Sequence, residues 1–600
     1  MIKLSDYVFN FIANLGVKHV FMVPGGGAMH LNNALGRNKN IRFVCNLHEQ
    51  ASAIAAEGYA RVTNNLGVAL VTTGPGGTNA VTGVAGAWLD STPCLFISGQ
   101  VKRSDLKGRS GVRQLGVQEI DIVSIVKSIT KYAVTIINPD EIRYHLEKAV
   151  FLAKSGRPGP VWIDIPLDVQ AAMIDPHKLK SFKETNIEVK VQSNFISTKV
   201  SRIIDLLNAS ERPVLLAGNG IRLAGVKEEF LKLADKLNIP VLTTWLGLDL
   251  IGDSHKLYFG RPGSIAPRGA NFTLQNSDFL LCIGARLDMA MVGYDYSKLA
   301  RLAKKVVVNI DQSEIDKIKA RIDIPVCADA GAFIKEFLLQ KNKIQKNPRK
   351  VWFNCCRKWK ENYPIILSQY KAYKKYVSTY VFSDVLSNIL NRNDILVPMS
   401  AGFCAELIFL SLRIKNGLRV FHNRGTGSMG FAIPSSIGAC LASGRKRTIC
   451  IEGDGGFQFN FQELETIKRL KLPIKIFVFN NKGYASIRSS QMKYFGTKFG
   501  ADESSGLSFP DTIKIAKAYG FKSSRILNHV DIEKKVAGFL RLTGPALCEV
   551  MIKPDEIRAP SLASRQQADG AMVSSPLEDL WPFLPRNEFL SNMLIPELKL

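Results

Sequence analysis

Long apolar runs, paired cysteines and acidic residues are all scarce in this chain of 600 residues. No apolar run reaches the roughly 18–20 residues that a membrane-spanning helix needs. Residues 1–6 lack the apolar core of a signal peptide, and their apolar side chains fall at helical spacing. The ten cysteines are scattered without a C-x-x-C pair, which argues against the common zinc and thioredoxin motifs. We therefore expect a cytoplasmic protein with reduced thiols and no membrane partner.

Acidic residues number 52 against 79 lysines and arginines, which gives a net charge of +27 at pH 7. Such a balance can mark a nucleic-acid partner. However, the basic residues are dispersed, and zinc-finger spacing, an RNP pattern and aromatic–basic interleaving are all absent. We expect a solvated basic surface that could attract anionic substrates, and no nucleic-acid partner. A polyanion-binding protein without enzymatic activity is the alternative from a different class.

Length and strand–helix alternation predict an α/β protein of several domains. A chain of this size is too long for one hydrophobic core and indicates about three to four domains. Apolar runs of strand length alternate with helical stretches, as in doubly wound parallel sheets. The predicted units cover residues 1–175, 196–340 and 375–558, joined by a polar link over 176–195 and a Lys/Asn-rich connector, and followed by a tail over 559–600.

The glycine-rich turn around Asp454 is the most informative feature of the chain. A β-branched run leads into the turn, and residues 461–470 then carry apolar side chains at helical spacing. Pro473 ends this helix, and residues 474–479 form a second apolar run that leads to Asn481. The order strand, turn, helix, strand brings Asp454 and Asn481 to the same edge of a parallel sheet, where open α/β sheets bind ligands.

These residue types fit a diphosphate that is held through a divalent cation. Asp454 offers a carboxylate oxygen, Asn481 an amide oxygen and Gly483 a backbone carbonyl oxygen. Mg²⁺ prefers such oxygen ligands and completes its octahedron with phosphate oxygens and water. The sequence therefore predicts a Mg²⁺ site at this edge.

Glycines surround the carboxylate in this turn. Gly453 precedes Asp454, and Gly455 and Gly456 would let backbone N–H groups approach a phosphate at the start of the helix, where the dipole favours anions. A nicotinamide-binding turn competes with this interpretation, but G-x-G-x-x-G requires glycine where Gln458 stands. We therefore interpret the turn as a diphosphate site.

The Gly-Asp-Gly turn and the following asparagine pair are also the cofactor signature of thiamine diphosphate (ThDP) enzymes. The chain resembles this family over most of its length and is most similar to the acetolactate synthase-like branch. Further matching motifs are residues 23–27, 48–50, 56–61, 73–79, 159–166 and 427–434. The resemblance implies an N-terminal pyrimidine-binding domain, a central Rossmann-like domain and a C-terminal diphosphate-binding domain. It also implies a homodimer or homotetramer, because this family builds each site from two chains.

The first and third units share the same order of predicted elements. Residues 68–71, 73–76 and 93–97 repeat the order of strand, glycine turn, helix and Pro-led strand that surrounds Asp454. Pro75 stands where Asp454 stands, so the first unit lacks the metal carboxylate. We therefore expect a duplicated fold in which one unit binds the diphosphate and the other binds the pyrimidine.

Glu49 is the residue that the resemblance assigns to catalysis. It follows an apolar strand and precedes a helix, so it should lie at a sheet edge. In the family, this carboxylate bonds a ring nitrogen of the aminopyrimidine and promotes the imino tautomer that activates the cofactor. Burial would raise its pKa and make proton sharing feasible near neutrality. The alternative is that Glu49 only caps the helix, and we expect His48 to be structural.

Other residues take their roles from the same resemblance. Met429 matches the large residue that props ThDP into a bent shape, and the alternative for a lone Met is core packing. The carbonyl of Gly427 would receive the aminopyrimidine N–H. Gln118 matches a substrate-side glutamine of acetolactate synthases, and Gly26 and Gly27 would line the same cavity.

The sequence departs from the acetolactate synthases where they bind the acceptor. Ser490 replaces a tryptophan that shapes the acceptor pocket, which leaves a wider and more polar space. Gly402 and Phe403 stand where a Gln-His pair commonly contacts the diphosphate. The acceptor could therefore differ from a second pyruvate, and a keto-sugar nucleotide is one candidate.

The expected activity is ThDP- and Mg²⁺-dependent decarboxylation of a 2-ketoacid, with pyruvate as the expected donor, and transfer of the two-carbon unit to a carbonyl acceptor. A simple decarboxylase that releases an aldehyde is the nearest alternative. In the middle unit, residues 218–220 and 284–288 match places where FAD can dock in the family. A bound FAD and a domain without cofactor both stay open.

Overall fold

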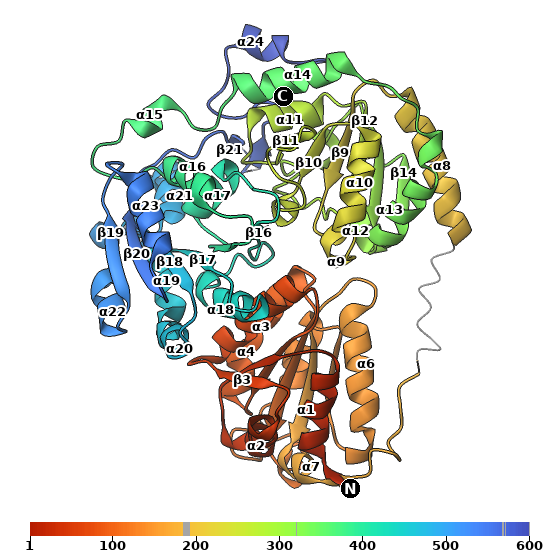
Figure 1. Ribbon diagram of the computed structural model, residues 1–600, viewed down its shortest axis with the longest axis vertical. Coiled ribbons are helices and arrows are strands. Elements are labelled where there is room, and N and C mark those ends of the chain that lie inside the picture. Colours follow the sequence, from red (N-terminus) through yellow and green to blue (C-terminus); the bar gives the residue numbers. More distant parts are fainter. Residues whose placement is uncertain (184–192, 320, 567–568, 571, 599–600) are drawn as a thin grey trace.

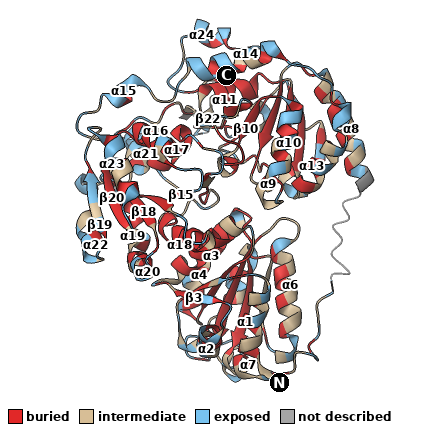
Figure 2. Ribbon diagram, viewed as in Figure 1, coloured by how far each residue is buried: buried red, intermediate tan, exposed pale blue. Residues whose placement is uncertain are grey.

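The computed structural model describes residues 1–183, 193–319, 321–566, 569–570 and 572–598, and contains three α/β domains (Figure 1). Each domain is built on a sheet of six parallel strands, which confirms the predicted fold class. The strands are mostly buried (Figure 2) because helices cover the sheets. In the described residues, no helix is long and apolar enough to cross a membrane. Residues 184–192 of the predicted link lie outside the described residues.

The N-terminal sheet has the strand order β3-β2-β4-β5-β7-β6. All residues of the central strand β4 (Gly67–Val71) are buried, and Leu70 and Val71 face separate cores on the two sides of the sheet. β1 (Ile2–Lys3), which precedes the first helix, pairs in antiparallel with β8 (Met173–Ile174) at the end of the domain. The other elements are α1 (Leu4–Asn14), β2 (His19–Met22), α2 (Met29–Arg37), β3 (Arg42–Cys45), α3 (Glu49–Thr63), α4 (Pro75–Leu89), β5 (Cys94–Gln100), α5 (Ile122–Val126), β6 (Tyr132–Thr135), α6 (Ile142–Lys154), β7 (Val161–Pro166) and α7 (Leu167–Ala171).

The C-terminal sheet repeats this topology. Its order, β16-β15-β17-β18-β20-β19, equals the N-terminal order when β15 is matched to β2 and the later strands follow in turn. The predicted duplication is thus confirmed. The helix expected over 461–470 is shorter, because Asp454 already starts a helix of its own. The elements are α16 (Thr379–Ile389), β15 (Ile395–Pro398), α17 (Phe403–Ser411), β16 (Arg419–Val420), α18 (Ala432–Ala442), β17 (Thr448–Gly453), α19 (Asp454–Asn460), α20 (Leu464–Arg469), β18 (Ile474–Asn480), α21 (Ala485–Phe495), α22 (Thr512–Ala518), β19 (Lys522–Ile526), α23 (Ile532–Arg541) and β20 (Ala546–Met551).

The middle sheet has the order β11-β10-β9-β12-β13-β14, so the order in which strands are added to the sheet reverses between the parallel neighbours β9 and β12. At this switch point an ideal Cβ on Gly218 would lie only 2.2 Å from the carbonyl oxygen of Gly284, so position 218 must be glycine. The elements are α8 (Ser193–Ala209), β9 (Pro213–Ala217), α9 (Gly220–Leu223), α10 (Lys227–Leu237), β10 (Val241–Thr243), β11 (Tyr258–Gly260), α11 (Arg268–Gln275), β12 (Phe279–Ile283), β13 (Lys304–Asn309), α12 (Gln312–Asp316), β14 (Ile324–Cys327) and α13 (Ala330–Leu339).

The connector and the tail are integral parts of the middle domain, a role that the sequence did not indicate. Part of the connector forms α14 (Lys350–Asn362), which packs on α11 and buries Trp352 and Trp359. The tail returns from the C-terminal domain and places Leu577 and Phe589 in the same core. It ends in α24 (Arg586–Ser591), which lies near α14 in Figure 1.

Helices α3 and α18 cross where the N- and C-terminal domains meet (Figure 1). An ideal Cβ on Gly58 would lie 2.3 Å from the carbonyl oxygen of Ser435, and one on Gly438 would lie 1.9 Å from that of Ala55. Backbone therefore touches backbone at this crossing, and only glycine allows such an approach.

Asp249 joins the middle and C-terminal domains. Its buried carboxylate accepts from Arg222 at 2.8 Å in its own domain and from Arg419 at 2.7 Å in the C-terminal domain. Burial by itself would raise the pKa of Asp249, but the two guanidinium groups outweigh it and lower the pKa to about 2.

We predict that Asp249→Ala lowers the free energy of unfolding by about 3–5 kcal/mol, because it leaves two largely buried guanidinium groups without their carboxylate partner. Since the folded pKa is depressed, this stabilisation is complete above about pH 4 and is lost as the pH falls through about 2. Urea unfolding and thermal melts measure both effects. Asp235, whose side chain is 57% exposed beside His255, is the control, and Asp235→Ala should cost less than about 1 kcal/mol. Equal losses in the two variants would contradict the prediction.

Candidate active site

Asp454 and Asn481 lie side by side at the carboxyl edge of the C-terminal sheet. Strands β17 and β18 pair in parallel with Gly453 opposite Phe479, so the residues that follow the two strands must meet. The backbone N–H of Asn481 donates to Asp454 Oδ2 at 3.1 Å. The structure therefore brings together the two residues that the sequence pattern assigned to one edge.

The carboxylate of Asp454 is buried among backbone N–H groups. Oδ1 accepts from Gly455 N at 2.8 Å, and Oδ2 also accepts from Gly483 N at 3.0 Å. Burial raises the pKa of Asp454 to about 6, although these donors act to lower it. The N–H donors orient the Asp454 carboxylate but carry no full positive charge. A bound cation would neutralise the negative charge of this buried group.

The side-chain oxygen of Asn481 has no hydrogen-bond partner although it is buried. The amide nitrogen of the same side chain donates to Cys404 Sγ at 3.4 Å, which fixes the orientation of the amide. Buried polar atoms are rarely left unpaired, and such an orphan calls for an explanation. One explanation is that this oxygen binds a divalent cation beside Asp454, because carboxylate and amide oxygens are suitable ligands for such an ion.

The glycines of this edge are needed for steric reasons. An ideal Cβ on Gly455 would lie 2.2 Å from Tyr484 Cε1, and one on Gly456 would lie 2.3 Å from Glu452 Oε1. Gly483 has φ +127° and leaves only 2.2 Å between an ideal Cβ and the carbonyl oxygen of Ala501. Close packing on these side chains and loops is therefore a second reason for glycine, beside access of a phosphate to the backbone.

Glu452 is a buried carboxyl group that the sequence reasoning missed. Its Oε1 accepts from Gly453 N and its Oε2 from Ala432 N, both at 3.1 Å. Burial raises the pKa of Glu452 to about 7. This side chain ties the start of α18 to the turn that holds Asp454. The only sequence signal was a carboxylate at the end of an otherwise apolar strand.

The loop before α18 carries Gly427 and Met429. Gly427 and Gly430 have positive φ values of +59° and +78°, so the turn needs glycine at both ends. The carbonyl of Gly430 accepts from Asn460 Nδ2 at 2.9 Å. Met429 is half-buried and is absent from the described hydrophobic cores, which favours the predicted contact with a ligand over core packing.

Glu49 is the first residue of α3 and follows the edge strand β3 after three residues. The helix is capped by His48, whose Nδ1 accepts from Gln50 N at 3.1 Å, so the capping role that was the alternative for Glu49 belongs to His48. The half-buried Glu49 carboxylate instead accepts from Asn79 Nδ2 at 3.0 Å. Glu49 is thus held by its own domain at the carboxyl edge of the N-terminal sheet.

Gly26, Gly27 and Gln118 lie at the same edge as Glu49. The two glycines follow β2, and the carbonyl of Gly27 accepts from Gln170 Nε2 at 2.7 Å. The exposed Gln118 has φ +61°, and its carbonyl oxygen lies 3.3 Å from Thr73 Oγ1, two residues after β4. The predicted site residues therefore fall into two groups, one at the carboxyl edge of each terminal sheet.

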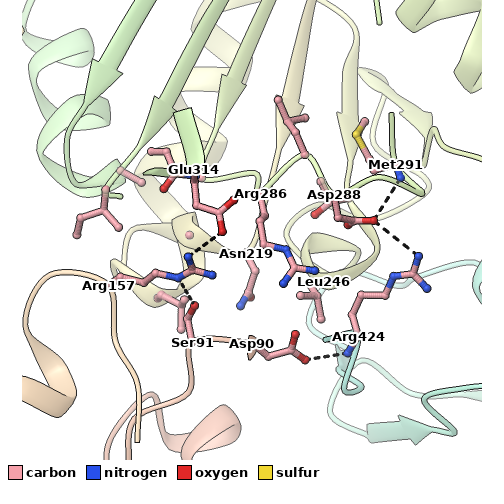
Figure 3. Close-up of a pocket in the computed structure, with 18 of the residues that line it drawn as sticks. Asp90, Ser91, Arg157, Asn219, Leu246, Arg286, Asp288, Met291, Glu314 and Arg424 are labelled. Carbon is pink, nitrogen blue, oxygen red and sulfur yellow. Dashed lines mark hydrogen bonds and ion pairs between the residues drawn. The ribbon is translucent and has the colours of Figure 1, made fainter. Parts of the chain in front are cut away.

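A separate cavity lies where the three domains meet (Figure 3). Its middle-domain wall is the carboxyl edge of the sheet and includes Asn219 and Arg286, which belong to the segments that the sequence matched to FAD docking. The C-terminal domain contributes Arg424, which lies over the Trp245 ring at 4.5 Å from its centroid. The backbone N–H of Arg424 donates to Asp90 at 2.8 Å. The cavity has about 1290 Å³ of empty space, counted to its open mouth.

Comparison with known families agrees with this geometry. Three descriptions match in order: "Thiamine pyrophosphate enzyme, N-terminal TPP binding domain" over residues 2–125, "central domain" over 200–337 and "C-terminal TPP binding domain" over 401–550. The chain belongs to the thiamine pyrophosphate enzyme family. Thiamine pyrophosphate is another name for ThDP, so the resemblance that the motifs suggested is confirmed, and the protein is a ThDP-dependent enzyme.

Curated relatives within this family cover almost the whole chain. The "Probable acetolactate synthase large subunit" of Methanocaldococcus jannaschii is 32% identical over 557 residues, or 92% of each chain. The "Acetolactate synthase large subunit" of Lactococcus lactis is 32% identical over 580 residues, which cover 94% of this chain and 95% of the relative. The chloroplastic acetolactate synthase of Arabidopsis thaliana is 30% identical over 579 residues, with 94% and 83% coverage.

Proposed function

We propose that this enzyme uses ThDP and Mg²⁺ to decarboxylate a 2-ketoacid, with pyruvate as the expected donor, and transfers the two-carbon unit to a carbonyl acceptor. The observation that carries the proposal is the buried Asp454 carboxylate beside the unpaired amide oxygen of Asn481. The printed names of the relatives, acetolactate synthase large subunits, support the reaction class. A cytoplasmic location is part of the proposal and is supported by ten free cysteines.

Each group of site residues has its own task in this proposal. Asp454, Asn481 and the Gly483 carbonyl would hold Mg²⁺ and, through it, the diphosphate. Bound ThDP supplies the electron sink that makes loss of CO₂ feasible. Glu49, held by Asn79, would share a proton with a ring nitrogen of the aminopyrimidine.

The remaining residues shape the cavity around the reacting centre. Met429 would support the bent cofactor, and the Gly427 carbonyl would accept the aminopyrimidine N–H. Gln118, Gly26 and Gly27 would line the substrate side.

We further propose that the site is completed between two copies of the chain, in a homodimer or homotetramer. The Glu49 carboxylate is bonded within its own domain, and both terminal domains expose large apolar side chains beside predicted site segments. Val117 next to Gln118 is 86% exposed, and Phe495 at the end of α21 is 75% exposed. Large exposed apolar side chains near a predicted site are typical of a surface that a second copy covers. Glu49 of one chain would then face Met429 of the other.

A keto-sugar nucleotide is a second candidate acceptor. Ser490 is exposed, and its hydroxyl donates to the carbonyl of Ile487 in its own helix at 3.0 Å. A short side chain that turns back to its own backbone leaves room where the acetolactate synthases have tryptophan, and the net charge of +27 favours an anionic acceptor. A simple decarboxylase is the remaining alternative.

The function is tested by product analysis with pyruvate, ThDP and Mg²⁺. We expect CO₂ release together with a carboligation product, identified by mass spectrometry, and a loss of about 100-fold or more in Glu49→Gln because proton sharing is removed. Acetolactate would identify pyruvate as the acceptor. Acetaldehyde as the sole product, even with a supplied keto-sugar nucleotide, would overturn the ligase assignment in favour of a decarboxylase.

The metal site is tested with Asn481→Leu. Because the variant removes an unpaired buried oxygen, the apoprotein should keep its thermal stability, whereas Mg²⁺-dependent ThDP affinity should fall by at least about tenfold. Titration calorimetry with and without Mg²⁺ measures the difference. Asn480 is the matched control, because its amide donates to Glu549 at 2.7 Å and accepts from Lys482 N at 3.0 Å. Asn480→Leu should lose stability instead, and normal ThDP affinity in Asn481→Leu would contradict the ligand role.

We also propose that the three-domain cavity binds FAD. Its position at the carboxyl edge and switch point of an open α/β sheet is the usual place for a dinucleotide. Arg286 points into it (Figure 3) and would pair with a diphosphate. The purified protein should retain added FAD through gel filtration, and Arg286→Ala should retain less than Arg202→Ala, an exposed control on α8. No retention by the unmodified protein would favour a domain without cofactor.

A further inference from the structure

The buried side chain of Gln100, at the end of β5, links the N-terminal sheet to the loop that carries Gln118. Its Oε1 accepts from Thr73 Oγ1 at 2.8 Å and from Val101 N at 3.0 Å. Its Nε2 donates to the carbonyl of Ile120 at 2.9 Å and to Asp164 Oδ2 at 3.2 Å. All hydrogen-bonding groups of this amide are engaged, so its orientation is fixed.

Asp164 holds Gln100 from the side of the sheet. Its carboxyl group also accepts from Ser98 Oγ at 2.5 Å and from Thr135 Oγ1 at 3.0 Å. The Ser98 hydroxyl in turn accepts from Trp162 Nε1 at 2.8 Å. Burial raises the pKa of Asp164 to about 7. The network spans strands β5, β6 and β7 and has no contact with the predicted metal ligands among the described residues, so it belongs to the N-terminal domain alone.

The Gln118 backbone is held in a strained conformation at the other end of the network. A φ of +61° is uncommon for glutamine and persists only where the surroundings enforce it. The Gln118 carbonyl faces inward, 3.3 Å from Thr73 Oγ1 and 2.6 Å from where a Cβ on Gly74 would be. Gly74 therefore has to be glycine, and the exposed Gln118 side chain is presented outward.

Glu119 organises the rest of the loop. Its carboxylate accepts from the backbone N–H groups of Lys107 at 2.6 Å, Leu115 at 2.8 Å and Gly116 at 3.2 Å. These donors keep the pKa of Glu119 low despite burial. The loop is thus folded around Glu119, and the hydrogen bond from Gln100 Nε2 to the Ile120 carbonyl, together with the contact of Thr73 with the Gln118 carbonyl, attaches it to the sheet.

We propose that Gln100 is a positioning residue for the substrate, acting through Gln118. Asp164 orients the Gln100 amide, and Gln100 holds the Ile120 carbonyl and the Thr73 hydroxyl. These bonds set the backbone of Gln118, so that its amide can donate to a carboxylate or carbonyl oxygen of the 2-ketoacid. The inference rests on the substrate-side role of Gln118 in the proposed function.

A double-mutant cycle tests the inference. Gln118→Ala and Gln100→Leu should each raise the KM for pyruvate by between about ten- and a hundredfold, because small misplacements have effects of this size. The ThDP dissociation constant should stay unchanged in both. The KM for pyruvate of the double variant should rise no more than that of Gln118→Ala alone, since both changes remove the same interaction. Additive losses would overturn the proposal.

Gln275 offers a matched control in the middle domain. It is also a fully buried glutamine, which donates to the Lys298 carbonyl and to Glu578 and accepts from Ala300 N. Gln275→Leu should lose as much thermal stability as Gln100→Leu while leaving the KM for pyruvate unchanged. An equal rise in KM would show that Gln100 acts only through stability and would overturn the proposal.

Hydrogen exchange of the full-length protein separates this inference from the proposed function. Amides of residues 107–120 should exchange faster in Gln100→Leu and Thr73→Val, but not in Thr73→Ser or Gln275→Leu, whether or not pyruvate is the donor. Unchanged exchange in Gln100→Leu would refute the anchoring. If exchange is faster in Gln100→Leu but the KM of Gln118→Ala is unchanged, Gln118 does not contact the substrate. That result would overturn both the role of Gln118 in the proposed function and the positioning role of Gln100.

Discussion

The close contact of α3 with α18 is the constraint on which the arrangement of the enzyme depends. Gly58 and Gly438 let the two backbones touch, so any side chain at either position would force the helices apart. Each helix begins near residues assigned to the cofactor: α3 starts at Glu49, and α18 follows Gly427 and Met429. A contact made of backbone has little freedom to adjust, and it therefore sets the relation of the N-terminal and C-terminal TPP-binding domains within each chain.

Buried carboxylates strengthen this arrangement at the domain boundaries. Asp249 joins the middle and C-terminal domains through Arg419. Asp90 of the N-terminal domain accepts from Arg61 and from the backbone N–H groups of Arg424 and Gly425. The loop that leads to Met429 is thus tied to a second domain at its start. Glu452 ties the end of the same loop to the Asp454 turn, so the segment between them has fixed ends.

The part of the site that follows from local order was predictable from the sequence. Asp454 and Asn481 follow adjacent strands of one strand–turn–helix–strand unit, and such a unit has only one compact arrangement. The duplicated strand order was readable for the same reason. Glu452, Gln100 and Arg424 were not predictable, because their roles depend on contacts between segments far apart in the chain. Gly455 was predicted from phosphate access, whereas its packing against Tyr484 required the structure. The boundaries of the middle domain could not be predicted for the same reason, since its core includes side chains of the connector and the tail.

The return of the tail to the middle domain has a consequence for how the chain is made. Leu577 and Phe589 belong to the core of a domain whose sheet strands end at Cys327. During synthesis, the ribosome must translate the whole C-terminal domain before these two side chains emerge, so the middle domain stays incomplete while its neighbours are already able to fold. An apolar surface around α11 and α14 is exposed during that interval. The enzyme therefore depends on residues translated after its C-terminal domain to complete its central domain.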